Sequence, residues 1–145
     1  MDVLKANLKK ANSKVAFIII FAILLLYLNL ESGNVFHVND NIGKSEAYTK
    51  NDIKGAMNTV KFYFFFFNRG CTLKDLWYDE AQSLPVITEM NNNGKVSNIK
   101  NAIIIMSNFD PGNTGRTDGD GYSWFLTRLG DTGFWTVTIH KSGQG

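Results

Sequence analysis

The sequence is poor in the residues that build small stapled or metal-bound domains. Its 145 residues include one cysteine, two prolines and two histidines. A lone Cys71 cannot form a disulfide within the chain, and no spacing of cysteine and histidine fits a zinc site. Neither His37 nor His140 has a serine or cysteine at a spacing that suggests a nucleophilic triad. A disulfide scaffold, a zinc domain and a triad hydrolase are therefore not expected, and we predict no cofactor and no metal.

The charge of the chain has no strong bias outside its first 30 residues. Residues 1–30 carry four lysines and one aspartate, a net charge of +3, and the remaining 11 basic and 12 acidic residues leave the rest at −1. A protein that binds a phosphate backbone needs a stripe of positive charge, which the body of this chain lacks. We therefore predict no nucleic-acid partner.

A long apolar run follows the N-terminal lysines. Residues 15–28 contain no charged or amide side chain, and the apolar character continues to residue 30. The run is short for a spanning helix and suits a signal peptide, but no pair of small residues follows that would mark a cleavage site. We predict an uncleaved transmembrane anchor over residues 15–30, with a cleaved signal peptide as the alternative. The lysines before the run place residues 1–14 in the cytoplasm and the body outside the cell, or secreted if the segment is cleaved.

The body begins with a predicted linker and one helix. Residues 31–44 are polar with isolated apolar residues, so we interpret them as a linker to an exported domain over residues 45–145. Thr49 and Asp52 have the spacing of a helix N-cap and its acidic partner. Apolar residues then recur every three or four positions from Ile53 to Phe67, a stripe that is expected to face the core, and Gly70 is expected to end the helix.

Four predicted strands follow this helix: residues 71–78, 101–109, 122–129 and 134–140. The last two are joined by the Gly130-Asp131-Thr132-Gly133 turn and should form an antiparallel hairpin. Residues 81–100 are harder to interpret, with a short strand at 86–90 as one possibility. This order predicts an α+β domain in which a curved antiparallel sheet wraps one helix, as in a cystatin-like or nuclear-transport-factor-like cone.

The body also resembles a family of uncharacterised exported domains, often lipoprotein-like, from Gram-positive bacteria. The resemblance spans about residues 41–139, and its most distinctive part is Gly70-Cys71-Thr72-Leu73 together with Trp77-Tyr78-Asp79-Glu80. Shorter matching pieces are Asn41-Ile42-Gly43-Lys44-Ser45-Glu46, Thr49-Lys50-Asn51-Asp52-Ile53, Ile103-Ile104-Ile105-Met106-Ser107-Asn108-Phe109, Leu126-Thr127-Arg128 and Trp135-Thr136-Val137. The chain departs from the family in lacking a lipid-acceptor cysteine. The resemblance implies export and a fold, and it supplies no reaction.

Two isolated features have structural explanations that we favour. Residues 110–121 contain aspartates and four glycines, but they lack the ligand order and the final glutamate of an EF-hand, so a solvated loop is expected rather than a calcium site. Cys71 is expected to be a small buried apolar residue, because no neighbouring residue in the sequence favours its thiolate.

One group of residues could form a binding cleft at the open end of the cone. It comprises Trp77, Tyr78, Asp79, Trp124 and Arg128. Asp79 could act as a general base if its pKa were raised, but the expectation that we favour is an ion pair between Arg128 and Asp79 or Glu80 at the edge of the sheet. We therefore expect a non-catalytic binding module that recognises a peptide, glycan, lipid or protein in the cell envelope. The alternative is a small-molecule enzyme or ligand carrier that uses the cleft.

Overall fold

The computed structural model describes residues 14–26, 32–115, 119–130 and 133–141. The chain divides into two compact units, residues 1–32 and residues 33–145. In the first unit, residues 14–26 form a helix that covers most of the predicted anchor, whose last residues lie outside the described part. Among the residues described, no helix combines the length and the apolar character that crossing a membrane requires.

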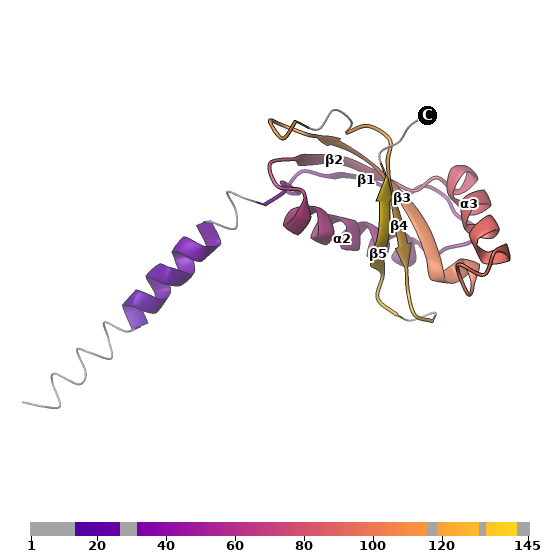
Figure 1. Ribbon diagram of the computed structural model, residues 1–145, viewed down its shortest axis with the longest axis horizontal. Helices are drawn as coiled ribbons and strands as arrows, with labels where there is room; N and C mark the ends of the chain where they lie inside the picture. The colour runs from indigo at the N-terminus through magenta and orange to yellow at the C-terminus, as the bar shows by residue number, and fades with distance from the viewer. Residues whose placement is uncertain (1–13, 27–31, 116–118, 131–132, 142–145) are drawn as a thin grey trace, which may run out of the picture. The chain divides into compact units, whose positions relative to one another are not determined.

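The second unit is an α+β domain built on a five-stranded mixed sheet (Figure 1). The strands lie side by side in chain order: β1 (Asn39–Asn41), β2 (Thr72–Trp77), β3 (Ala102–Asp110), β4 (Tyr122–Thr127) and β5 (Thr136–Lys141). The helices are α2 (Lys50–Phe67), α3 (Glu80–Asn92) and a 3₁₀ turn, η1 (Ile99–Asn101). The predicted α+β class, the four C-terminal strands and the antiparallel pairing of β4 with β5 are confirmed.

Helix α2 begins and ends where the sequence predicts. The Thr49 hydroxyl accepts the Asp52 N–H at 3.1 Å, and the Asp52 carboxylate accepts the Thr49 N–H at 3.1 Å, which forms a capping box. At the other end, Gly70 adopts a φ of 71°, which glycine reaches without steric cost. The predicted apolar stripe is buried over its first five members: Ile53, Ala56, Met57, Val60 and Phe64. The prediction was wrong for Phe67, which is the last residue of the helix and is 63% exposed.

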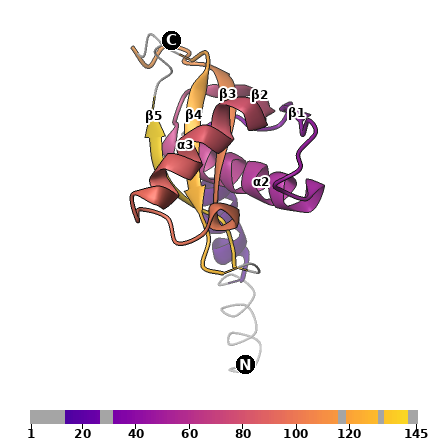
Figure 2. The ribbon, with the colours of Figure 1, turned by 90° about the vertical axis from the view of Figure 1, so that its right-hand side faces the viewer.

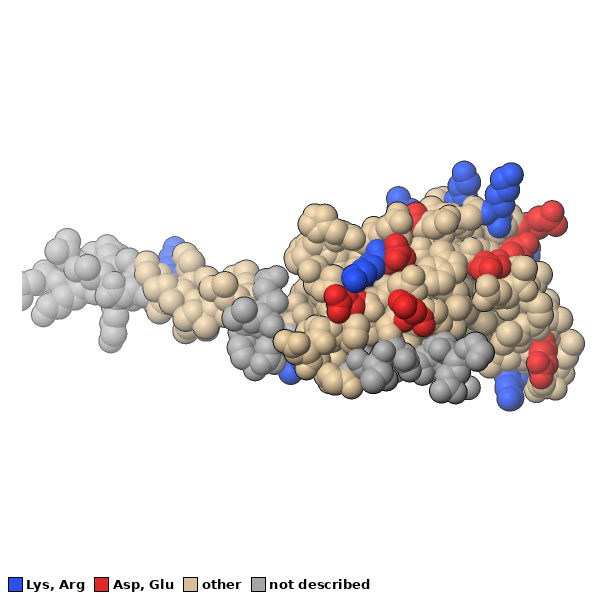
Figure 3. Space-filling view, turned by 90° about the horizontal axis from the view of Figure 1, so that it is seen from above, with Lys and Arg blue, Asp and Glu red and all other residues tan. Residues whose placement is uncertain are grey.

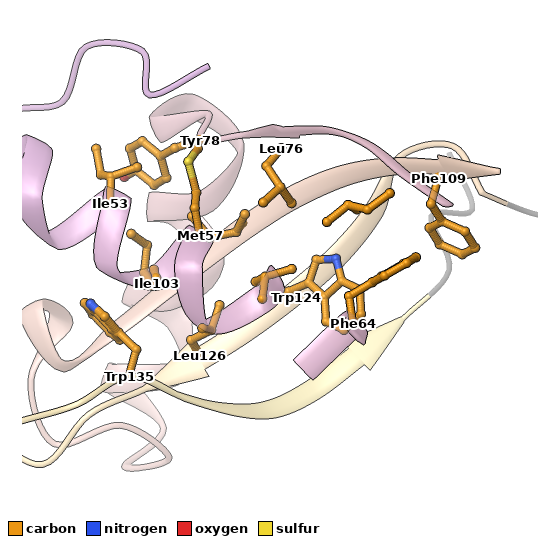
Figure 4. Close-up of a cluster of buried hydrophobic side chains, with 14 of the residues drawn as sticks. Ile53, Met57, Phe64, Leu76, Tyr78, Ile103, Phe109, Trp124, Leu126 and Trp135 are labelled. Carbon is orange, nitrogen blue, oxygen red and sulfur yellow. The ribbon is translucent and has the colours of Figure 1, made fainter. Parts of the chain in front are cut away.

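This stripe packs on one face of the sheet and forms the main core (Figure 4). Trp124 of β4 is fully buried there, in ring contact with Phe64 at 6.3 Å and with Tyr63 at 5.8 Å. Its indole N–H donates to the Ser107 hydroxyl on β3 at 2.8 Å, so the buried polar atom is satisfied. Phe64 also contacts Phe109 at 5.5 Å, and these rings link α2 to β3 and β4.

A second helix, α3, covers the opposite face of the sheet (Figures 1 and 2). Ile87 packs there with Val96, Ala102 and Ile104, and the Ser83 hydroxyl donates to the Ile104 carbonyl at 3.3 Å. The expectations of one helix and of a short strand near residues 86–90 were therefore wrong. Only Ser83 and Ile87 are buried in α3, and Pro85 lies inside it, so the apolar stripe that identifies a helix is weak.

The segment predicted as a linker contributes a strand. β1 pairs in parallel with β2, with Asn39 opposite Asp75, so the sheet is mixed and not wholly antiparallel. Closer to the N-terminus, the Asn34 N–H donates to the Cys71 carbonyl at 2.9 Å. The side chains of β1 are all exposed, and its backbone pairing leaves no apolar pattern in the sequence.

We expect Phe64→Ala to destabilise the domain by about 3 to 5 kcal/mol, because it empties a fully buried ring position. Phe62→Ala, on the exposed side of the same helix, should change the free energy of unfolding by less than about 0.5 kcal/mol. Urea unfolding followed by tryptophan fluorescence measures both. Equal losses in the two variants would contradict this packing of α2.

Candidate binding site

The five residues predicted to line a cleft do not lie together. Trp124 belongs to the core beneath α2, and Trp77 is half-buried at the end of β2. Tyr78 is buried in the same core, in edge contact with Tyr48 at 5.5 Å. Tyr78 and Asp79 are adjacent only because they are neighbours in the chain. Arg128 forms its ion pair with Asp52, which is not one of the five residues.

Asp79 serves as the N-cap of α3. Its Oδ1 accepts the Gln82 N–H at 3.2 Å, and its Oδ2 accepts the Gln82 side-chain amide at 2.8 Å. These bonds satisfy the amide at the start of the helix. Asp79 therefore has a structural task, and nothing in its surroundings equips it as a general base.

Glu80, expected from the sequence only as a possible partner of Arg128, binds the loop that precedes α2. Its carboxylate accepts hydrogen bonds from the Ser45 hydroxyl, from the Glu46 N–H at 3.1 Å and from the Ala47 N–H at 3.3 Å. The Ser45 hydroxyl and these two amides hold the pKa of Glu80 below its usual range, although partial burial opposes them. The only sequence signal for this role is its place in the distinctive Trp77 to Glu80 motif.

Tyr48 is a buried residue next to the same loop. Its hydroxyl donates to the Ala102 carbonyl at 2.6 Å, and burial raises its pKa to about 12. A hollow of about 640 Å³ lies over this loop. Its lining residues are Gly43, Lys44, Ser45, Glu46, Tyr48, Thr49, Lys50, Ile53 and Glu80. The Ser45 hydroxyl and the Glu80 carboxylate bond to each other, so these two groups are occupied within the protein.

Arg128 joins the end of β4 to the start of α2. Its Nη1 donates to Asp52 Oδ1 at 2.5 Å, its Nε donates to the Lys100 carbonyl at 3.1 Å, and its guanidinium lies 4.5 Å from the Trp135 ring centre. The predicted pairing of Arg128 with Asp79 or Glu80 was therefore wrong. The Arg128 side chain is only 8% exposed, so this is a largely buried ion pair. Although partial burial opposes it, the bonds from Thr49 and Arg128 keep the pKa of Asp52 below its usual value.

Two hollows lie beside Arg128, at the end of the β4–β5 hairpin. One has a volume of about 530 Å³ and the other of about 330 Å³, and both include Arg128, Gly133 and Phe134 in their lining. We call them together the hairpin-end site. The further lining residues of the larger hollow are Lys95, Val96, Ser97, Asn101, Thr127, Leu129 and Thr136. The further lining residues of the smaller hollow are Asn51, Asp52, Gly55, Thr59 and Trp135.

The hairpin-end site carries two apolar side chains that the fold leaves in water. Leu129 and Phe134 are each 94% exposed, one at either side of the hairpin turn. In the larger hollow, the Oδ1 atom of Asn101 is buried and accepts no hydrogen bond within the described part of the chain. Exposed apolar side chains beside hollows are features of a surface that a partner covers.

Strand β5 adds an open edge to this site. Within the described residues, β5 pairs with β4 on one side and has no strand on the other. Thr136 and Thr138 of this edge are exposed and Val137 packs against the core, so the backbone there is ordered and extended. An open edge offers N–H and C=O groups to an added strand.

The remaining predictions concern Cys71, metal ligands and the 110–121 loop. Cys71 is buried as predicted, with its sulfur 3.8 Å from the Pro111 carbonyl. The described residues contain no group of three or more His, Cys, Asp or Glu side chains that could hold a metal ion. Part of the 110–121 loop lies outside the described residues, so the choice between loop and calcium site stays a prediction. On the face that Figure 3 shows, basic and acidic side chains are interspersed and no single sign dominates.

Removing either partner of the Arg128 ion pair should destabilise the domain. We expect Arg128→Ala to cost about 2 to 4 kcal/mol, because it strands the Asp52 carboxylate in a partly buried position. A double-mutant cycle between Asp52 and Arg128, measured by urea unfolding, should give a coupling above about 1 kcal/mol. The matched cycle between Asp79 and Arg128 should give a coupling near zero, and the reverse order of the two couplings would show that this pairing is wrong.

The chain has no match among protein-family models, curated proteins or solved structures. Its resemblance to exported domains of Gram-positive bacteria thus stays a prediction from the motifs.

Proposed function

We propose that this protein is an exported, membrane-tethered interaction module that binds an extended segment of a partner protein at the hairpin-end site. The exposure of Leu129 and Phe134 beside the two hollows carries the proposal. Neither side chain contributes to the core, so folding alone gives no reason for a large apolar residue at either position. Covering such a side chain gains roughly 1.5 to 3 kcal/mol, which makes the pair suitable anchors for a partner.

The open edge of β5 supports an extended partner in particular. A segment that adds to this edge gains main-chain hydrogen bonds, and its alternate side chains point toward the two faces of the sheet. Affinity would then come from the backbone pairing and specificity from the pocket beside Leu129 and Phe134.

The tether rests on the sequence. The four lysines before residue 15, the apolar run over residues 15–30 and the lack of a small-residue cleavage motif support a membrane anchor with the domain outside the cell. The resemblance to exported domains agrees with this location. The finer likeness to a cystatin-like or nuclear-transport-factor-like cone is supported by α2 on the core face of the sheet, while α3 and the parallel β1 depart from it.

A small-molecule carrier or enzyme is the second candidate, and one observation favours it. The hollows beside Arg128 exceed the roughly 300 Å³ that small-ligand sites commonly occupy. Against an enzyme, Asp79 caps α3 and Arg128 donates to Asp52 and to the Lys100 carbonyl, so both candidate groups are already engaged.

The proposed location predicts how a protease will act on cells. Protease added to intact cells that produce the full chain should remove the domain, because residues 33–145 lie outside the membrane in this topology. An antibody tag at the N-terminus should survive, and a tag at the C-terminus should be lost. Loss of the C-terminal tag only after lysis would contradict the proposed location.

The proposed binding mode predicts the effect of changing the two apolar anchors. Peptides selected from a random display library against the full chain in detergent should bind Leu129→Ser/Phe134→Ser at least about tenfold more weakly, because two apolar contacts are lost. Val86→Ser, which changes an exposed apolar residue of α3, serves as the matched control and should bind normally. Failure to enrich any peptide, or equal binding to all three proteins, would exclude this mode. Retention of a small molecule in native mass spectra would then favour the second candidate.

A further inference from the structure

A second apolar surface lies on the outer side of α2, away from the hairpin-end site. Phe62 is 67% exposed, Phe66 is 43% exposed and Phe67 is 63% exposed, whereas Phe64 alone of this run points into the core. The Phe62 and Phe66 rings lie 4.8 Å apart, and the Phe65 and Phe66 rings lie 5.0 Å apart. We call Phe62, Phe65 and Phe66 the α2 aromatic surface. Phe67, the last residue of α2, lies next to this surface on another side of the helix, with its ring 4.5 Å from that of Tyr63. A solvent-facing helix side is normally polar, so the fold does not account for these rings.

The chain enters the domain beside this surface. The Gly33 N–H donates to the Phe65 carbonyl at 2.9 Å, and a Cβ at Gly33 would lie 2.5 Å from the Phe64 carbonyl oxygen. Only glycine can come this close to the last turn of α2. The first residue of the domain is thereby fixed next to the α2 aromatic surface.

The distance along the chain from this point to the apolar segment is very short. Leu30 ends the predicted anchor and precedes Gly33 by three residues. Three residues reach at most about 11 Å, whatever conformation they adopt. If residues 15–30 lie in a bilayer, Phe65 must lie within about this distance of the membrane region where the anchor ends.

We propose that the α2 aromatic surface lies in the headgroup layer of the membrane that holds the anchor, and that it fixes the orientation of the domain on that membrane. This inference rests on the proposed tether. Phenylalanine rings on one side of a helix are suited to the boundary between headgroups and acyl chains, where they leave water without crossing the bilayer. The tether supplies a high local concentration of lipid, so a small surface is sufficient.

A fluorescent label can test this contact directly. The full chain, with Phe67→Cys labelled by a polarity-sensitive dye, is reconstituted into phosphatidylcholine and phosphatidylglycerol vesicles that contain nitroxide-labelled lipid. We expect the dye at position 67 to be quenched and blue-shifted, and a dye at Val86→Cys on α3 to be neither. Cys71 is buried, so the parent chain serves as the labelling blank. Equal absence of quenching at both positions would overturn the inference.

A second variant separates binding from mere proximity. Phe62→Ser/Phe66→Ser, made in the Phe67→Cys chain, should lose the quenching and keep its melting temperature, because neither ring belongs to the core. Quenching that persists in this variant would show that the tether alone brings position 67 to the lipid, and would overturn the inference. A blue shift that grows with protein concentration and is not accompanied by nitroxide quenching would show that a second copy covers the surface, which would also overturn it.

Flotation of the same vesicles keeps this inference distinct from the proposed tether. A chain that does not float with vesicles after carbonate washing lacks the anchor, and the proposed tether fails. A chain that floats and shows no quenching at position 67 keeps the tether and loses only the inference about the α2 aromatic surface.

Discussion

The buried face of α2 is the contact on which the rest of the domain depends. Phe64 and Trp124 meet beneath the helix, and the Trp124 indole bonds to Ser107 on the neighbouring strand, so one cluster holds α2, β3 and β4 together. Once α2 is fixed, its first turn presents Asp52 to Arg128, and the Trp135 side chain lies against Gly55 of the same helix. The hairpin-end site thus owes its position to core packing about three turns away.

Those parts of the fold that have a side-chain pattern could be predicted from the sequence. The α2 stripe, its capping box and the alternation of β4 all depend on residue types at a fixed spacing, and all are present. The α3 helix could not be recognised, because Pro85 lies inside it and one of its two buried residues is the polar Ser83. The β1 strand could not be recognised either, since it is held by backbone pairing with β2 and its side chains face water.

The candidate site was predicted less well than the fold, for a related reason. Alternation predicts that Tyr122, Trp124, Leu126 and Arg128 share one face, and the first three do lie on the core face of β4. Arg128 follows the end of the strand, and alternation cannot say which carboxylate it will meet. Asp52 can be recognised in the sequence as a capping residue. Its ion pair with Arg128 cannot, because the two residues lie 76 positions apart in the chain. Leu129 and Phe134 could not be singled out from the sequence, because apolar residues beside a turn are equally common in cores.

The length of α2 is constrained in a way that its sequence alone would not reveal. In the first turn, Asp52 accepts a hydrogen bond from the Arg128 guanidinium. In the last turn, the Phe65 carbonyl accepts a hydrogen bond from the Gly33 N–H. Inserting one residue between these points would turn one end relative to the other by about 100° and lengthen the helix by about 1.5 Å, so one of the two attachments would break. The two attachments therefore fix the length of the helix, which is about 27 Å for its 18 residues.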